Sequence, residues 1–186
     1  MTNPHSQLIK ACIKKDKQAQ SKLYELCFGY LYPVCLRYAT CEDDAKEYLN
    51  LGFYKILKNL KKLHKSESFL PWSKRVMINS ILDELKKKKR YQNHVQLSDI
   101  AQLETVSGTV QFDENLGAQE IYLAIRSLPP QTASVFNLHA IDGYKHREIA
   151  KMLGISEGTV KWHYSDARKR LQKLLAKKGY PEKMAS

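Results

Sequence analysis

Apolar residues recur at intervals of three and four positions along most of the chain, and this period predicts α-helices. In the first ninety residues the spacing predicts four helices, the last of which runs from about residue 69 to residue 91. Pro33 falls within the second of these helices, where a proline is expected to kink or interrupt it. The polar residues 61–68 are expected to form a loop before the fourth helix.

The third predicted helix begins with two carboxylates, Asp43 and Asp44, which suit the positive end of a helix dipole. Its apolar face is expected to run through Tyr48, Leu51, Ile56 and Leu60, with Phe53 and Leu57 alongside.

Two stripes run along the fourth predicted helix. An apolar stripe can face a core and comprises Ile78, Ile81, Leu82 and Leu85. The other turns from aromatic to polar toward five consecutive cations, residues 86–90, and comprises Phe69, Trp72, Val76, Asn79 and Asp83. Rings beside lysines suit single-stranded nucleic acid, because bases stack on rings while cations follow phosphates. Phe69 and Trp72 can equally be plain core residues, and Asn79 is either a buried amide or a group that reads a base.

Charge divides the chain, whose formal net charge is +12, into three parts. Residues 1–90 carry +10, residues 91–120 carry −5 with neither Lys nor Arg, and residues 121–186 carry +7. The middle part shows no sustained period, and we interpret residues 93–117 as an acidic flexible linker. The sequence therefore predicts an all-α protein of two small helical domains, residues 1–92 and 118–186. Two basic bodies favour a nucleic acid as partner.

The most specific motif lies in the last third of the chain. Pro129 and Pro130 must end one helix and can begin another. Residues 146–153 predict a short amphipathic helix, which Gly154 can end in the left-handed conformation, and Ser156 is a good N-cap for the next helix. That next helix is expected to pack inward through Val160, Tyr164, Ala167, Leu171 and Leu174. Its opposite face comprises Gly158, Lys161, Trp162, Ser165, Asp166 and Lys169. The pattern predicts a helix-turn-helix whose second helix enters the major groove of DNA.

Three stretches, taken together, resemble a bacterial sigma factor of the extracytoplasmic-function group. The run D-A-K-E-Y-L-N-L-G-F at residues 44–53 resembles the family's polymerase-clamp helix. Residues 69–90, from F-L-P-W to the basic run, resemble its promoter-melting helix, and residues 128–171 resemble its upstream-element reader. The resemblance implies that the chain binds core RNA polymerase and directs promoter-specific transcription initiation. The first domain would recognise and melt the −10 element, and the second would read the −35 element. An anti-sigma factor is a further implied partner.

The resemblance also implies three sets of site residues. The set expected to bind polymerase is Asp44, Glu47, Asn50, Phe53, Tyr54 and Leu57. The set expected at the −10 element is Lys61, Lys62, His64, Trp72, Asn79, Asp83, Lys86, Lys87 and Arg90. The set expected at the −35 element is Arg147, Glu157, Thr159, Lys161, Trp162, Ser165, Asp166 and Lys169.

The chain departs from the family's pattern in both domains. Asn50 and Leu51 stand where the clamp helix usually has Gln-Glu, which removes one carboxylate from the polymerase contact. His163 and Asp166 stand where the reader helix usually carries arginines, so the upstream sequence it reads is expected to differ from the family's commonest one. Asp166 can accept a hydrogen bond from a cytosine amine. Trp162 can touch a thymine methyl or fold back against the neighbouring helix, and Lys161 can reach a base edge or a phosphate.

A stand-alone LuxR-type helix-turn-helix regulator is the alternative, because its reader shares the run I-S-x-x-T-V-K at residues 155–161. An enzyme is not expected. The histidines lack the spacing of metal ligands and the chain has no glycine-rich phosphate loop, so no catalytic residue, metal or cofactor is predicted. The lack of a long apolar run and of a signal peptide predicts a cytoplasmic protein with no membrane insertion of its own. Reduced thiols are therefore expected at Cys12, Cys27, Cys35 and Cys41.

Overall fold

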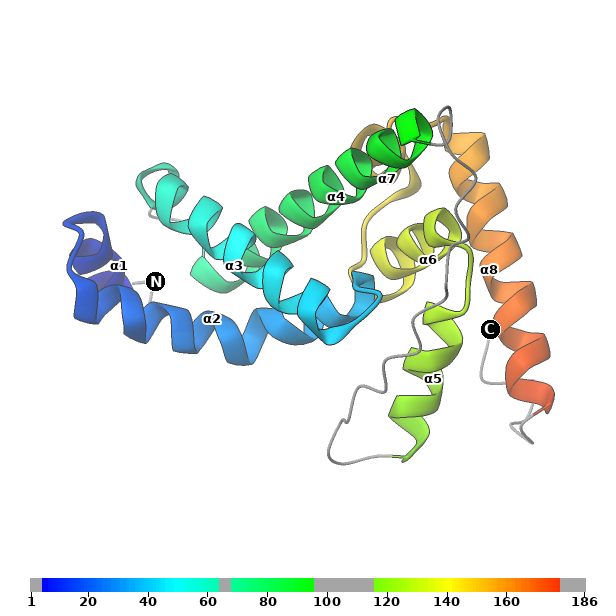
Figure 1. Ribbon diagram of the computed structural model, residues 1–186, viewed down its shortest axis with the longest axis horizontal. Helices are drawn as coiled ribbons and strands as arrows, with labels where there is room; N and C mark the ends of the chain where they lie inside the picture. The colour runs from blue at the N-terminus through cyan, green and yellow to red at the C-terminus, as the bar shows by residue number, and fades with distance from the viewer. Residues whose placement is uncertain (1–4, 64–67, 96–115, 178–186) are drawn as a thin grey trace. The chain divides into compact units, whose positions relative to one another are not determined.

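The computed structural model describes residues 5–63, 68–95 and 116–177 (Figure 1). Within these ranges all regular secondary structure is α-helix, 3-10 turn or π-helical turn, with no β-strand, which confirms the predicted all-α fold. The chain divides into two compact units, residues 1–109 and 110–186. Residues 96–115, most of the predicted linker, lie outside the described residues, so the linker stays a prediction.

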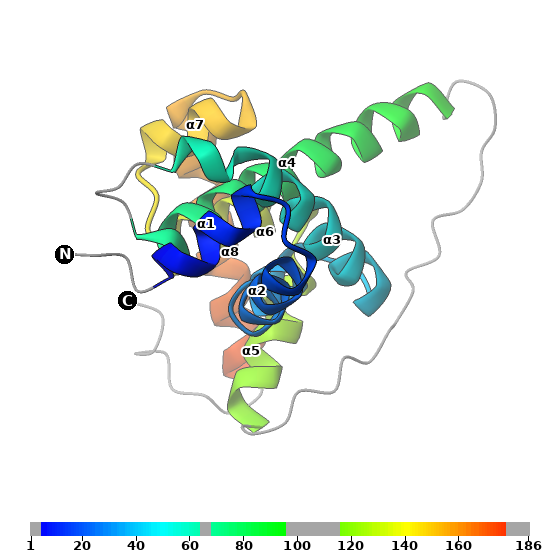
Figure 2. The same cartoon turned by 90° about the vertical axis from the view of Figure 1, so that its left-hand side faces the viewer.

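The first unit is built from α1 (Ser6–Ile13), α2 (Lys17–Tyr38), α3 (Glu42–Asn59), the 3-10 turn η1 (Leu60–Lys62) and α4 (Phe69–Val95). Helices α2, α3 and α4 pack on one another, and α1 packs on α2. Figure 2 looks nearly along α2, with α1 above it. The core of this unit includes Leu23, Leu31, Tyr48, Leu49, Ile56, Leu60, Phe69, Met77, Ile78 and Ile81.

Helix α2 passes through Pro33 without a break, so the interruption predicted there does not occur. Pro33 has no N–H to donate to the carbonyl of Gly29, one turn earlier. Both residues are exposed, so water can bond that carbonyl.

Helix α3 buries a stripe that differs from the predicted one at Leu51, which is 37% exposed. The buried positions are Ala45, Tyr48, Leu49, Gly52 and Ile56. Their spacing of three and four residues places Leu51 off the stripe, so the expectation that it packs inward was wrong. Gly52 lies where α3 meets α4: a Cβ atom there would overlap the sulfur of the fully buried Met77.

All four cysteines are free thiols, three of them buried. Burial raises the pKa of Cys27 and of Cys35 to about 12, which keeps both groups protonated at neutral pH. Cys41 has a structural role, because its sulfur lies 3.5 Å from the backbone nitrogen of Asp44 and caps α3.

The second unit consists of α5 (Leu116–Arg126), α6 (Pro130–Phe136), the π-helical turn η2 (Asn137–Ile141), α7 (His146–Leu153) and α8 (Glu157–Lys177). The predicted break is confirmed, because α5 ends before Pro129 and α6 begins at Pro130. One core cluster comprises Ile125, Leu128, Ala167 and Leu171, and further buried residues are Val135, Leu138, Ile149 and Val160. None of the helices in the described residues combines the length and the apolar character that crossing a bilayer requires.

Candidate nucleic-acid interface

The turn between α7 and α8 has the geometry that the sequence predicts for a helix-turn-helix. Gly154 ends α7 with φ +70°, and its N–H donates to the carbonyl oxygen of Ala150 at 2.9 Å. Ser156 caps α8, because its Oγ accepts a hydrogen bond from the N–H of Thr159 at 3.0 Å. A left-handed glycine followed by a serine cap fixes the angle between the two helices.

The face of α8 that was predicted to meet DNA is open to solvent. Trp162 is 61% exposed, and Glu157, Lys161, Ser165 and Lys169 are exposed on the same helix. Arg147, the member of the predicted −35 set that lies on α7, is exposed as well. Thr159 and Asp166 are half-buried. On the opposite side Val160, Ala167 and Leu171 are buried as predicted, and Tyr164 is half-buried. Leu174 was predicted to pack inward and is 37% exposed, because it lies near the end of α8.

Asp166 and His163, the two departures from the family's pattern, make contacts within the second domain. The Oδ2 atom of Asp166 accepts a hydrogen bond from Nε of Arg170 at 2.8 Å, one turn along α8. His163 Nδ1 lies 2.9 Å from Thr132 Oγ1, which ties α8 to α6. Sequence reasoning missed Arg170, although its spacing of four residues from Asp166 is a recognisable signal of a pair. The Trp162 ring meets the His163 ring edge-on, with 4.9 Å between centroids, and remains largely open to solvent.

Two histidine rings pack near Tyr164 of α8. The rings of His139 and His146 are 4.3 Å apart, and the Tyr164 ring of α8 lies 4.5 Å from that of His139. His139 Nδ1 is 2.8 Å from the carbonyl oxygen of Tyr144, whereas Nε2 of His146 is buried without a hydrogen-bond partner. Burial, followed by electrostatic interactions with His139 and Lys161, lowers the pKa of His146 below its ordinary value.

In the first domain, the stripe of α4 that was predicted to meet the −10 element is partly core. Phe69 is fully buried and Trp72 is 8% exposed, with ring centroids 6.2 Å apart, so the core interpretation fits both. Asn79 is exposed, which excludes the interpretation as a buried amide. A DNA contact by Asn79 therefore remains the prediction, whereas Trp72 offers little ring surface.

The remaining described members of the predicted −10 set are five cations and one carboxylate. Lys61 and Lys62 are exposed on η1, and His64 lies outside the described residues. Lys86, Lys87 and Arg90 are exposed on α4 and line a hollow of about 220 Å³ together with Lys55 and Asp83. Lys55 Nζ lies 3.0 Å from Asp83 Oδ2.

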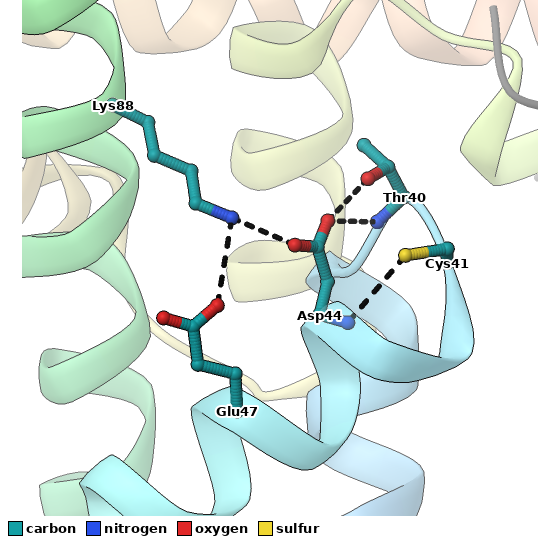
Figure 3. Close-up of polar contacts among 5 residues, drawn as sticks. All are labelled: Thr40, Cys41, Asp44, Glu47 and Lys88. Carbon is teal, nitrogen blue, oxygen red and sulfur yellow. Dashed lines mark hydrogen bonds and ion pairs between the residues drawn. The ribbon is translucent and has the colours of Figure 1, made fainter.

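Asp44, predicted to meet polymerase, is held by neighbours within the domain (Figure 3). Its Oδ1 accepts from Lys88 Nζ at 2.7 Å, and its Oδ2 accepts from the hydroxyl and the N–H of Thr40. Lys88 Nζ also lies 4.0 Å from Glu47 Oε2 and 5.1 Å from the centroid of the Tyr48 ring. Burial raises the pKa of Asp44, but the hydrogen bonds from Lys88 and Thr40 outweigh burial and hold the pKa below its usual value. Sequence reasoning could not single out Lys88 within a run of five cations.

The outer face of α3 presents the rest of the predicted polymerase set. Glu47 and Asn50 are exposed, Tyr54 is 63% exposed, and Phe53 and Leu57 are half-buried. Asn50 Oδ1 accepts from the hydroxyl of Tyr24 on α2 at 2.9 Å, and the Tyr24 ring meets Phe53 edge-on at 5.0 Å. The aromatic residues Tyr24, Phe28 and Tyr32 of α2 thus continue the α3 face. The rings of Phe28 and Tyr32 stack with 4.8 Å between their centroids. The helical spacing of these α2 rings could have revealed them.

Comparison with known proteins agrees with this arrangement. The family model "Sigma-70 region 2" matches residues 23–91, which span α2 to α4. The model "Sigma-70, region 4" matches residues 118–171, which contain the helix-turn-helix. A match to region 2 in the first domain does not support the LuxR-type alternative.

Relatives align along nearly the whole chain. It is 24% identical over 170 residues to the ECF RNA polymerase sigma factor SigM of Mycobacterium tuberculosis, covering 91% of this chain and 84% of SigM. It is 25% identical over 176 residues to the ECF RNA polymerase sigma factor SigW of Bacillus subtilis, covering 90% of this chain and 94% of SigW. The fold is similar to that of the sigma factor RpoE of Bartonella quintana, solved in complex with the anti-sigma factor NepR. That likeness has a TM-score of 0.59 and 22% identity, covering 84% of this chain and 96% of RpoE. With regions 2 and 4 both present, the chain belongs to the bacterial RNA polymerase sigma factors of the extracytoplasmic-function group.

Proposed function

We propose that this sigma factor uses its first domain to recognise and melt the −10 element and its second domain to read the −35 element of the same promoter. One observation carries the proposal: each sigma region presents its own exposed cationic helix face. In region 2 this face is the end of α4, residues 86–90, and in region 4 it is the outer face of α8 around Lys161 and Lys169. When exposed Lys and Arg side chains neutralise DNA phosphates, the counterions condensed on the DNA are released, so both faces favour binding to DNA.

The polymerase would dock on the exposed face of α3. Glu47, Asn50 and Tyr54 lie on this face, and the aromatic rings of α2 extend it. Asp44 is already bonded to Lys88 and Thr40, so its contribution would be to hold α3 against α4 rather than to reach the polymerase. Asn50 and Leu51 would supply an amide and an exposed apolar side chain where the family has an amide and a carboxylate.

The partners that follow are core RNA polymerase, promoter DNA and an anti-sigma factor. The RpoE neighbour was solved with an anti-sigma factor bound, and this supports a similar partner for the present chain. A polymerase subunit of this kind works in the cytoplasm and selects promoters, and it needs no catalytic group of its own.

Transcription with purified core polymerase, with and without the protein, tests the proposal. Pooled genomic fragments serve as templates, and the 5′ ends of the transcripts are sequenced. We expect new transcripts, each preceded by a common upstream element and a common element near the start. Tight duplex binding by the protein alone, with transcription equal to that of core polymerase, would instead support a stand-alone regulator.

A further inference from the structure

The hollow between α3 and α4 in the first domain is an electropositive site. Its lining consists of four cations and one carboxylate: Lys55, Asp83, Lys86, Lys87 and Arg90. These groups sum to a formal charge of +3, and the carboxylate of Glu84, 2.7 Å from Lys87 Nζ, offsets one of these charges. The hollow stays net positive, so an anion is the complementary ligand. The volume is about 220 Å³, several times the ~30 Å³ that one water occupies in the liquid, so a hydrated phosphate group fits.

Lys55 is the one lining residue that comes from α3. Its Nζ lies 3.0 Å from Oδ2 of Asp83 on α4, and this pair brings the ammonium beside the basic end of α4. The Lys55 side chain is 35% exposed, so the ammonium can meet a ligand from solvent. The sequence pattern gave no reason to select this lysine, because its partner lies 28 residues away along the chain.

We propose that this hollow binds one backbone phosphate of promoter DNA at the −10 element, and that Lys55 is a phosphate-contacting residue of that site. The other lining residues, Asp83, Lys86, Lys87 and Arg90, all belong to the set expected at that element. The inference rests on the proposed function, and it assigns α3 a second role: one face for polymerase and the side against α4 for DNA. A phosphodiester carries one negative charge, which the net positive charge of the hollow attracts.

Salt dependence of DNA binding tests the proposal. Holoenzyme is reconstituted from core polymerase and the full chain, and its affinity for a fluorescent promoter fragment with a pre-melted −10 region is measured across salt concentrations. Lys55→Gln should weaken binding and reduce the slope of log affinity against log salt by about 0.7, the value for one single-strand phosphate. Lys55→Arg keeps the charge and should restore the wild-type slope.

Lys58→Gln is the matched control, because Lys58 is an exposed lysine on the same helix that does not line the hollow. It should leave the slope unchanged. A wild-type slope in Lys55→Gln, or an equal loss in Lys58→Gln, would overturn the phosphate site and leave the proposed function standing. Wild-type protein that adds no promoter binding to core polymerase would overturn both. Thermal melting detects any loss of folding in Lys55→Gln. In that case Lys55→Arg decides the outcome, because it is expected to fold and it retains the charge. A salt slope below that of the wild type in folded Lys55→Arg would count against the site.

Discussion

Lys88 Nζ lies 2.7 Å from Asp44 Oδ1, and this ion pair joins the basic end of α4 to the first turn of α3 (Figure 3). A second pair, Lys55 with Asp83, links the same two helices with the charges exchanged between them. Helix α3, which is expected to bind polymerase, is therefore fixed to α4, which is expected to bind promoter DNA. Lys88 is the cation of the basic run that reaches α3, whereas Lys87 pairs with Glu84 on α4 itself.

Lys88→Gln should lower the free energy of unfolding by about 1 kcal/mol, the upper end for pairs near the surface, because the Asp44 side chain is only 19% exposed. Lys87→Gln is the matched control. Lys87 pairs with Glu84 on its own helix and is fully exposed, so its loss should cost less than the loss of Lys88. Urea unfolding of both variants and of Asp44→Asn checks this, and the effects of Asp44→Asn and Lys88→Gln should be less than additive. Equal costs for Lys87→Gln and Lys88→Gln would contradict the link.

Gly52→Ala should destabilise the first domain by roughly 1–3 kcal/mol, because the new methyl group meets buried Met77 where α3 and α4 are closest. Gly29→Ala makes a sharp comparison, since Gly29 is an exposed glycine of α2 with open space around its Cβ position. It should gain about 0.5–1 kcal/mol from helix propensity alone. Opposite shifts in melting temperature are expected, and a stabilising Gly52→Ala would show that the helices do not pack as described.

The second domain should lose stability as the pH falls below about 6.5, the ordinary pKa of histidine. Burial and electrostatic interactions with His139 and Lys161, opposed by Glu157, lower the pKa of His146 in the folded chain. The unfolded chain therefore takes up a proton at higher pH than the folded one, and the loss begins near pH 6.5 and is complete below the folded pKa. Thermal melting between pH 8 and pH 5 should show this, and His146→Gln should flatten the dependence. The same pH profile in His146→Gln would place its origin elsewhere.

Lys161→Ala should weaken binding of the holoenzyme to promoter duplex. If Lys161 reads a base, the loss should be about 1–3 kcal/mol and should depend on the base at one position of the −35 element. If Lys161 meets only a phosphate, the loss should be uniform across sequences. Lys173→Ala is the comparison, since Lys173 is exposed three turns farther along α8. Binding unchanged in Lys161→Ala on every duplex would remove Lys161 from the DNA face.

The local features of the fold could be predicted from sequence because they depend on neighbours within one turn. The period of apolar residues located α7 at residues 146–153, and the chemistry of Gly154 and Ser156 located the turn after it. The interruption predicted at Pro33 was wrong because the energetic cost of a proline within a helix depends on whether the carbonyl left without a donor meets water. Which face of α2 the core covers decides this.

The candidate site was less predictable, since its contacts join residues far apart in the chain. Asp44 meets Lys88 across 44 residues, and a run of five cations gives no sign of which lysine is paired. The burial of Trp72 likewise depends on the packing of α4 against the other helices of the domain. The exposed face of α8, by contrast, followed from helical spacing alone, because the other side of that helix carries the apolar stripe.

The claim that each domain reads its own promoter element is tested most directly by transcription from a library of templates with a randomised upstream region. The holoenzyme is assayed with wild-type protein, Asn79→Ala and Lys161→Ala, and the transcribed templates are sequenced. Wild type should enrich two separate blocks of sequence. Asn79→Ala should change preferences only in the block near the start site, and Lys161→Ala only in the upstream block. A single enriched block, or two blocks that change together in either variant, would contradict the division of promoter recognition between the two domains.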